Sequence, residues 1–329
     1  WRMLPVLFIG NMPFLKRPTL PDLVYMRGGQ ENIMKKLLKF LAYAVSLLLV
    51  VIAGVYGYAH YKTGEALALR YDMKDAPLVL AADATTLAYG ARLFVAKGCA
   101  DCHGAQGEGK LVFDAGPVAK IVGPNLTAGG VGKTLTADDI ARAIRHGVGE
   151  NGRPLIFMPS GDYKDLSDAD TAAIIAHIQS LPASDNQPEA MEISPLGKIL
   201  YALNKLPLFP AEMIDHSPRQ RAAPVAAVTA EYGKYLAQTC TGCHGANFAG
   251  QRVPGTPSEL PPAANLTQAA LKNWSQNDFQ TALRTGKRPD GSDINPFMPW
   301  PAMSKMTDDE MAALWLYLSG LPAVENTPK

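Results

Sequence analysis

Two short motifs of the same form constrain this chain more than any other feature. Each has two cysteines separated by two residues and followed at once by a histidine: Cys99-Ala100-Asp101-Cys102-His103 and Cys240-Thr241-Gly242-Cys243-His244. The chain has four cysteines, so the two motifs use all of them. Two thiols at this spacing can add to the two vinyl groups of a porphyrin, and the adjacent histidine then supplies an axial nitrogen to its iron. The motifs therefore predict two covalently bound haem c groups, with His103 and His244 as iron ligands.

Three other uses of paired cysteines fit the sequence less well. A thioredoxin-like redox pair would follow a strand in a β-α-β pattern, which the sequence does not show. A structural zinc site needs four ligands, and each motif offers three. Two disulfides would suit a protein outside the cytoplasm, but they would leave the repeated histidine without a role.

The two motifs lie at matching places in a longer internal repeat. Each copy has, around its cysteines, an opening helical stretch, an Asn-Leu-Thr segment, a short amphipathic helix that ends at glycine, and a capped closing helix. These four segments are 87–94, 125–127, 139–147 and 167–181 in the first copy, and 231–236, 265–267, 278–286 and 307–321 in the second. The repeat predicts two helical domains of the same kind.

The rest of the chain divides around these two domains. We expect domain 1 at residues 85–182 and domain 2 at residues 229–323. Residues 183–228 are rich in proline, alanine and charge, which is typical of a linker, although the apolar segment 199–209 can pack on a domain. The expected order before domain 1 is an uncertain leader, a membrane anchor and a polar linker, at residues 1–33, 34–62 and 63–84.

The anchor is predicted from a stretch without charge between Phe40 and Ala59. A helix of about 20 apolar residues covers roughly 30 Å, the thickness of the hydrocarbon core. Lysines before it favour a cytoplasmic N-terminus, and tyrosines at its far end suit the outer interface: Lys35, Lys36, Lys39, Tyr56, Tyr58 and Tyr61. The alternative is a cleaved signal peptide, whose apolar region is normally shorter. We therefore expect an uncleaved helix in the bacterial cytoplasmic (inner) membrane, with the haem domains facing the periplasm.

Residues 1–33 differ in character from this anchor. Their first part is interrupted by Pro5, Pro13, Pro18 and Pro21, whereas the sequence from Met34 onwards is typical of the start of an exported bacterial protein. Our hypothesis is that the natural protein begins near Met34. A mass of the purified protein that includes Trp1 would contradict it.

One methionine recurs at the place where a second iron ligand is needed. A low-spin electron carrier needs two axial ligands, and a methionine thioether opposite histidine raises the potential. Met158 lies 55 residues after His103, and Met298 lies 54 residues after His244; each is followed by proline. Core filling would explain an isolated methionine better, but the repeat favours iron ligation by Met158 and Met298. Met303 is a competing candidate in the second copy, as is Met306.

Two further polar positions recur between the copies. Arg145 and Arg284 end the short amphipathic helix, where a guanidinium can pair with haem propionates; a solvated helix face explains them equally well. Asn125 and Asn265 are expected to hold a loop or to bond near the methionine side of the haem. The remaining histidines do not recur and are not expected to bind iron: His60 at the membrane interface, His146 after a helix, His177 on the closing helix and His216 in the linker.

Together these residues resemble class I cytochrome c domains in tandem. The shared features are the opening helix, C-x-x-C-H, Pro-Asn-Leu, Met-Pro and the closing helix. The resemblance implies an all-α fold for each domain, behind one N-terminal transmembrane helix. It also implies haem c on all four cysteines, His/Met ligation, and opening helices around Gly90 and Tyr235 that cross the closing helices near Ile178 and Leu318. The second copy departs from the pattern at Ala264, which stands where proline is expected.

The resemblance implies an electron carrier, with no catalytic residue assigned. The chain is similar to the dihaem cytochromes that accompany periplasmic dehydrogenases, and a dihaem subunit of a haem–copper oxidase also has an N-terminal anchor. The implied partners are a dehydrogenase, a quinol-oxidising complex or a terminal oxidase. The alternative is a dihaem enzyme of the peroxidase or thiosulfate-oxidising type, which needs one open haem. A formal charge of +1 argues against a nucleic-acid partner.

Overall fold

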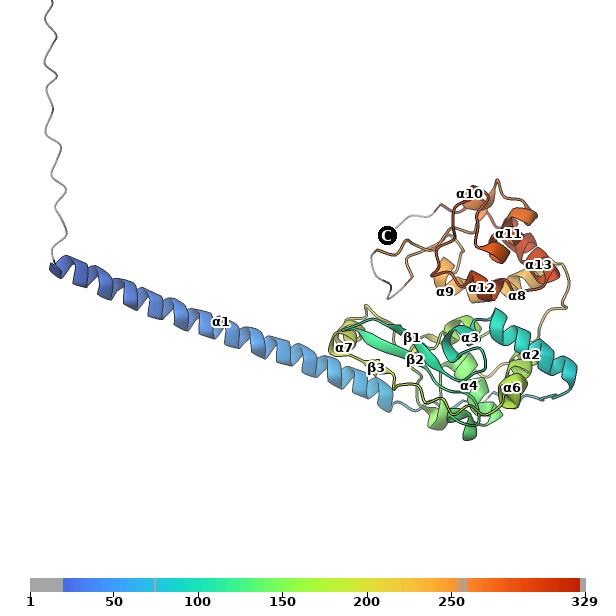
Figure 1. Ribbon diagram of the computed structural model, residues 1–329, viewed down its shortest axis with the longest axis horizontal. Helices are drawn as coiled ribbons and strands as arrows, with labels where there is room; N and C mark the ends of the chain where they lie inside the picture. The colour runs from blue at the N-terminus through green and yellow to red at the C-terminus, as the bar shows by residue number, and fades with distance from the viewer. Residues whose placement is uncertain (1–19, 74, 254–255, 257–258, 326–329) are drawn as a thin grey trace, which may run out of the picture. The chain divides into compact units, whose positions relative to one another are not determined.

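The computed structural model of the protein describes residues 20–73, 75–253, 256 and 259–325 (Figure 1). Most of the predicted leader, residues 1–19, lies outside the described residues, so the proposed start near Met34 stays a prediction. The chain divides into two units, Trp1–Val55 and Tyr56–Lys329. The second unit contains both predicted domains.

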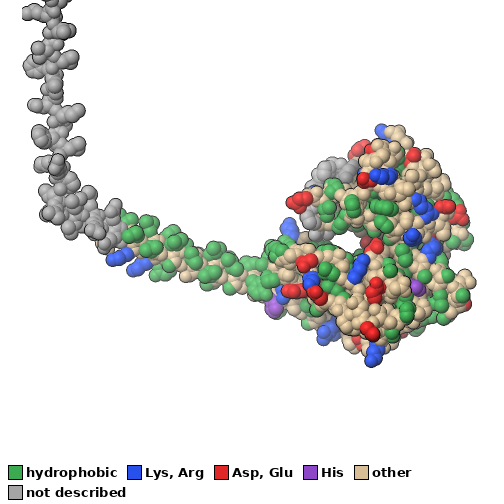
Figure 2. Space-filling model, viewed as in Figure 1, with side chains coloured by type: hydrophobic (Ala, Val, Ile, Leu, Met, Phe, Trp, Pro, Cys, Tyr) green, Lys and Arg blue, Asp and Glu red, His purple; other side chains and the backbone are tan. Residues whose placement is uncertain are grey.

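Helix α1 (Leu20–Ala68) contains the predicted anchor. Its segment Asn32–Ala68 is long and apolar enough to cross a membrane, with a mean hydropathy of 2.3, and none of its most apolar window is buried. Figure 2 shows hydrophobic side chains along the visible face of this helix. At its C-terminal end, which belongs to the second unit, Ala59, Thr63 and Ala66 are buried. Because these three residues are spaced four and three apart, they form one packed helix face.

Domain 1 is a chain of short helices around one helix crossing. In order, its elements are α2 (Ala84–Ala96), α3 (Cys99–His103), β1 (Lys110–Asp114), β2 (Ala119–Gly123), η1 (Val131–Lys133), α4 (Ala137–His146), η2 (Glu150–Gly152), α5 (Ser160–Tyr163) and α6 (Asp168–Ser180). Side chains cap the three main helices, and the cap of the closing helix α6 is expected from the sequence. Asp83 accepts from the N–H groups at the start of α2, Thr136 forms a capping box with Asp139 in α4, and Ser167 caps α6.

Domain 2 repeats this order without the strands, among the residues that the structure describes. Its elements are α8 (Ala230–Ala237), η4 (Gln238–Cys240), α9 (Thr241–His244), α10 (Gln268–Leu271), α11 (Gln276–Thr285), α12 (Trp300–Met303) and α13 (Asp308–Ser319). The linker between the domains holds β3 (Glu192–Ile193), α7 (Pro195–Ala202) and η3 (Pro210–Met213). Its apolar middle is buried in a small cluster with the end of α1: Ala66, Tyr201, Leu206, Leu208 and Phe209.

The opening and closing helices of each domain cross at a glycine. A Cβ atom at Gly90 of α2 would lie 2.0 Å from the carbonyl oxygen of Ala173 in α6, and one at Gly233 of α8 would lie 1.9 Å from that of Ala313 in α13. Only glycine lets the two backbones approach this closely. The helices therefore cross as expected, but the crossing points lie five residues before Ile178 and Leu318.

A small antiparallel sheet corrects the expectation of an all-α fold. Its strand order is β1-β2-β3, with Lys110 opposite Gly123 and Ala119 opposite Ile193. Segment 110–123 is rich in Val, Ile, Leu and Phe around an Ala-Gly-Pro turn, a composition that favours a hairpin. The corresponding part of domain 2 contains four prolines, which lack the N–H group that a ladder needs.

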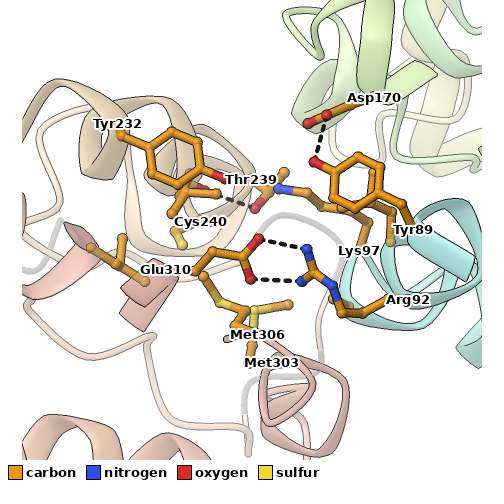
Figure 3. A pocket seen from close by; sticks show the side chains of 14 residues that line it. Tyr89, Arg92, Lys97, Asp170, Tyr232, Thr239, Cys240, Met303, Met306 and Glu310 are labelled. Carbon is orange, nitrogen blue, oxygen red and sulfur yellow. Dashed lines mark hydrogen bonds and ion pairs between the residues drawn. The ribbon is translucent and has the colours of Figure 1, made fainter. Parts of the chain in front are cut away.

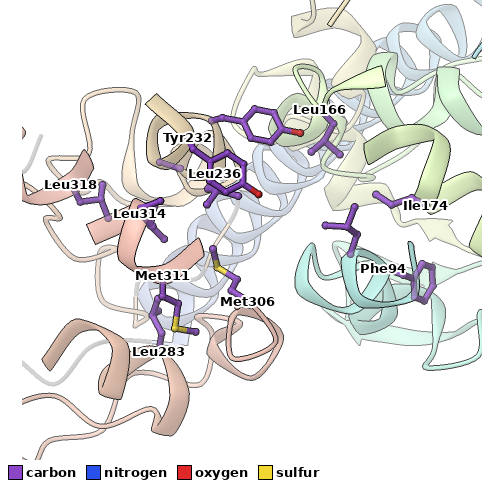
Figure 4. Close-up of a cluster of buried hydrophobic side chains, with 14 of the residues drawn as sticks. Phe94, Leu166, Ile174, Tyr232, Leu236, Leu283, Met306, Met311, Leu314 and Leu318 are labelled. Carbon is purple, nitrogen blue, oxygen red and sulfur yellow. The ribbon is translucent and has the colours of Figure 1, made fainter. Parts of the chain in front are cut away.

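The two domains share one hydrophobic core. Figure 4 shows side chains of α2 and α6, including Phe94 and Ile174, in the same buried cluster as Leu236 of α8 and Met311 and Leu314 of α13. All five are at most 5% exposed. The domains are therefore packed against each other in the second unit, rather than joined only by their linker.

Candidate haem sites

The first cysteine motif forms a helix of five residues between two left-handed glycines. Gly98 precedes α3 with φ of +77° and Gly104 follows it with φ of +86°. These turns present both cysteines and the histidine on one short helix. The Nδ1 atom of His103 lies 3.1 Å from the carbonyl oxygen of Pro124, in the loop after β2. That contact orients the ring and leaves Nε2 to ligate iron, because a hydrogen bond at one ring nitrogen fixes the role of the other.

The second motif repeats this arrangement. The Nδ1 atom of His244 lies 2.7 Å from the carbonyl oxygen of Ala264, and Gly245 follows with φ of +80°. Ala264 stands where domain 1 has Pro124. Since the contact uses the backbone carbonyl, the departure from Pro-Asn-Leu leaves it intact. In both motifs burial lowers the pKa of the histidine, partly opposed by this hydrogen bond. A lowered pKa keeps the imidazole neutral, which is the form that binds a metal.

The cysteines themselves suit covalent attachment better than thiol chemistry. None of the four forms a disulfide. Burial raises the pKa of Cys99 to about 12 and that of Cys240 to about 11, whereas a redox-active pair depends on a lowered thiol pKa. Within the described parts of the chain, no group of three or more His, Cys, Asp or Glu side chains could hold a metal ion. Paired thiols followed directly by a histidine fit covalent haem attachment.

The two methionine loops are built alike. Each methionine is half-buried against the shared core and is followed by a proline that begins a one-turn helix, α5 or α12. The N–H of Ser160 donates to the carbonyl of Met158 at 2.8 Å, and that of Trp300 donates to the carbonyl of Met298 at 2.8 Å. Ligation of iron by these two methionines stays a prediction that their equivalent settings support.

The competing methionines of domain 2 lie elsewhere. Met306 is buried in the shared core, with 7% of its surface exposed, as core filling would require. Met303 and Met306 both line a pocket between the domains, together with Arg92 and Glu310 (Figure 3). Packing between the domains accounts for these positions, and ligation of the second iron by Met298 rather than by one of them stays a prediction.

The recurring arginines bind the start of the closing helix. Arg145 Nη2 donates to Asp168 Oδ1 at 2.7 Å and to Thr171 Oγ1 at 3.1 Å, and Arg284 Nη2 donates to Asp308 Oδ1 at 2.7 Å. Arg145 is only 1% exposed, so the solvated-face interpretation is wrong for it. Its Nε atom has no hydrogen-bond partner among the described residues. Contact of either arginine with a haem propionate stays a prediction.

The recurring asparagines hold a loop, which is one of the two roles expected for them. Asn125 accepts from the N–H of Thr127 and donates to the carbonyl of Ser184 at 2.8 Å. Asn265 accepts from the N–H of Thr267 and donates to the carbonyl of Val324 at 2.7 Å. Each side chain therefore ties the loop that follows the cysteines to the segment after the closing helix. A role beside the haem stays a prediction.

A buried polar network that the sequence does not reveal joins domain 1 to the linker. His146 is 1% exposed, with Nε2 at 3.0 Å from Asp75 Oδ2 and Nδ1 at 3.0 Å from His216 Nδ1. Arg221 Nη1 donates to the same Asp75 oxygen at 2.7 Å. Asp75, His146 and the linker residues His216 and Arg221 come from three separate parts of the sequence and do not recur, so no spacing or repeat indicates the network. His146 is the last residue of α4, as expected for a helix C-terminal residue, and it is buried in this network.

Comparison with known proteins agrees with this geometry. The cytochrome c family model matches residues 87–182 and 230–322. The chain is 28% identical over 312 residues to a diheme cytochrome c-type protein of Cereibacter sphaeroides, an alignment that covers 85% of this chain and 97% of that protein.

Two dehydrogenase subunits are also similar. The chain is 23% identical over 286 residues to the fructose dehydrogenase cytochrome subunit of Gluconobacter japonicus, covering 75% of this chain and 55% of that one. It is 34% identical over 94 residues to the gluconate 2-dehydrogenase cytochrome c subunit of Pantoea cypripedii, covering 26% of this chain and 21% of that one. The chain thus spans about half of the first subunit's length and a fifth of the second's.

The two family matches each contain one complete C-x-x-C-H turn. With the similarity to a dihaem protein along nearly the whole chain, they show that this is a dihaem cytochrome c, an electron-transfer protein with two covalently bound haem c groups. The chain belongs to the cytochrome c family, with two cytochrome c domains in tandem.

Proposed function

We propose that the protein carries electrons on the periplasmic side of the cytoplasmic membrane, from a membrane dehydrogenase or quinol-oxidising complex to a downstream acceptor such as a terminal oxidase. The observation that carries this proposal is the equivalence of the two haem sites. Each has a histidine oriented by a backbone carbonyl and a methionine loop held by the same hydrogen bond. Two sites of the same closed kind suit transfer of electrons better than chemistry on a substrate.

In each site the protein residues have distinct tasks. Cys99 and Cys102 hold the first haem and Cys240 and Cys243 the second. His103 and His244 would bind iron through Nε2, and Met158 and Met298 would each supply the second protein ligand. The haem supplies the reversible exchange of one electron at iron. Closed coordination by the protein keeps water and small molecules from the metal, so that the electron is the only thing exchanged.

The alternative is a dihaem enzyme of the peroxidase or thiosulfate-oxidising type. Such an enzyme needs one iron with an open or exchangeable position. Here Met158 and Met298 lie in loops with the same proline, the same following helix turn and the same hydrogen-bond distance of 2.8 Å. These shared features favour the same closed coordination at both irons.

We further propose that the apolar part of α1, within residues 34–62, anchors the domains to the membrane. Its length and composition support this, and the lysines that precede its apolar core favour a cytoplasmic N-terminus. A tether raises the effective concentration of the haem domains, 85–182 and 229–323, near partners in the same membrane. The linker at 63–84 leads from the anchor to domain 1.

The proposed donor is a dehydrogenase because relatives of the chain are cytochrome subunits of gluconate, fructose and alcohol dehydrogenases. The test uses membranes from a strain that makes the full chain and from a matched deletion strain. Gluconate, fructose, ethanol or a quinol is added anaerobically, and reduction of the two haems is followed by their visible absorption. We expect one of these donors to reduce both haems, and oxygen to reoxidise them.

A chain whose haems stay oxidised with every donor, yet react with hydrogen peroxide at the rate of a catalytic turnover, would refute the proposal. It would favour the peroxidase alternative. A double variant, Cys240→Ala with Cys243→Ala, is the control for the second haem, since it keeps the first site and the anchor.

A further inference from the structure

The two domains meet through a pair of buried carboxylates at equivalent positions. Asp170 is the third residue of α6, and Glu310 is the third residue of α13. They are 6% and 5% exposed. Each follows a hydroxyl N-cap, Ser167 or Thr307, whose oxygen accepts from its backbone N–H. Their carboxyl groups are therefore fixed at the start of the closing helices.

Asp170 joins the opening helices of both domains. Its Oδ1 accepts from the hydroxyl of Tyr89 in domain 1 at 2.8 Å, and its Oδ2 accepts from the hydroxyl of Tyr235 in domain 2 at 2.5 Å. The Tyr235 oxygen in turn accepts from the N–H of Ser167 at 3.1 Å. One carboxylate thus receives one bond from its own domain and one from the other.

Glu310 makes the second cross-domain contact. Arg92 of domain 1 donates two bonds to its carboxylate, at 2.7 and 2.9 Å (Figure 3). Tyr232 of domain 2 lines the same pocket. Tyr89 and Tyr232 occupy the same position of the repeat, directly before the crossing glycine, and Arg92 and Tyr235 each lie three residues further on. The interface is thus nearly two-fold symmetric; we call these six residues the carboxylate clamp.

The clamp lies beside the haem-attachment turns of both domains. Lys97, two residues before Cys99, is buried and lines the same pocket as Cys240 (Figure 3). Close by, α5 of domain 1 packs on the second motif: a Cβ at Gly242 would lie 2.4 Å from a carboxylate oxygen of Asp162. A shift of one domain against the other would therefore move one attachment turn relative to the other.

The hydrogen bonds of the clamp are also costly to break if one domain moves against the other. A buried carboxylate that loses its partner is left uncompensated in a medium of low polarity, which is strongly unfavourable. The Arg92–Glu310 pair is bidentate, which fixes direction as well as distance. The tyrosine hydroxyls add bonds of defined length on both sides.

We propose that the carboxylate clamp is a positioning device that holds the two haem domains at one fixed separation. The proposal rests on the proposed function only in that each motif carries a haem. Arg92 and Tyr235, the two cross-domain donors, are its positioning residues. Tyr89 binds Asp170 from within its own domain, and Tyr232 lines the pocket beside Glu310, so neither makes a cross-domain bond and the two provide matched controls.

Pulsed EPR on the oxidised full chain in detergent tests the proposal through the distance distribution between the two ferric irons. The wild type is expected to give one narrow distribution. The variant Arg92→Gln with Tyr235→Phe is expected to broaden it at least twofold, and Arg92→Gln alone to give an intermediate width. The variant Tyr89→Phe with Tyr232→Phe keeps both cross-domain bonds and is expected to retain the wild-type width.

A broad distribution in the wild type, or a wild-type width in the Arg92→Gln, Tyr235→Phe variant, would overturn the proposal. A clamp that only stabilised the fold would lower the melting temperature of that variant without changing the width. Arg92→Gln alone keeps the test decisive if the double variant does not fold, since the Arg92 side chain is 27% exposed. The visible spectrum of each variant reports its iron ligands. Loss of the ligation that the proposed function requires is therefore recognised separately from a change in the iron–iron distance.

Discussion

Replacing the glycine at each helix crossing tests the packing on which both haem sites depend. In Gly90→Ala the new methyl group would lie 2.0 Å from the Ala173 carbonyl oxygen, and in Gly233→Ala it would lie 1.9 Å from that of Ala313. The crossing helices would have to separate by about 1 Å, and overpacking of this kind costs about 1–3 kcal/mol. The upper end applies because the obstructing atom is backbone. Alanine offsets about 1 kcal/mol through its higher helix propensity, so we expect a net loss of about 2 kcal/mol.

The assay is equilibrium denaturation of the haem-loaded protein, followed by haem absorption. Gly64→Ala is the control, because a Cβ at Gly64 of α1 meets nothing within 4 Å; its unfolding midpoint is expected to match or slightly exceed that of the wild type. If Gly90→Ala and Gly233→Ala both unfold at the wild-type midpoint, the helices do not cross at these glycines and the reasoning is refuted.

Three further predictions follow from the site and its surroundings. Burial raises the pKa of Asp162 to about 6 from 3.8, so the folded state binds the proton more tightly, and stability is fully present below 3.8 and is lost as pH rises from there through about 6. Asp162→Asn should therefore raise the free energy of unfolding by about 1–3 kcal/mol at pH 8 and leave it nearly unchanged at about pH 3, and an equal effect at both values would contradict this. Burial lowers the pKa of His146, so the contribution of this histidine to stability is present above about pH 6.5 and is lost as pH falls through its lowered pKa in the folded state. In His146→Gln the free energy of unfolding, measured between pH 5 and 7.5, should therefore depend less steeply on pH. An unchanged slope against pH would refute this. Met158→Ala and Met298→Ala should each open one iron, so that reduced protein binds carbon monoxide at half of its haem, with Met303→Leu as a silent control; no binding in either variant would exclude these methionines as ligands.

Local features of the fold could be predicted because they depend on residues close together in the sequence. The C-x-x-C-H turns, the capped closing helices and the glycine-terminated amphipathic helices follow from spacing and from capping residues such as Ser167 and Thr307. The repeat adds information that a single copy lacks, because Met158 and Met298 recur at matching positions before a proline, and this is why they are predicted to be ligands rather than core residues. Family membership then follows from the same residues that carry the haem chemistry.

Features that join distant segments could not be predicted. Arg92 and Glu310 are 218 residues apart, and nothing local marks either as a partner of the other. The network of His146, Asp75 and Arg221 is equally non-local. The sheet was missed for another reason. The family resemblance implies helices, and the hairpin at 110–123 is a local departure that its apolar, β-branched composition indicates.

The most direct test of the central claim, that the chain holds two closed His/Met haems for electron transfer, is the visible spectrum of the haem-loaded protein when oxidised, when reduced, and when reduced under carbon monoxide. The account predicts two low-spin haems per chain, a sulfur–iron charge-transfer band in the oxidised form, and no change on addition of carbon monoxide. A high-spin fraction in the native protein, or carbon monoxide binding at one haem, would contradict it and favour the dihaem enzyme.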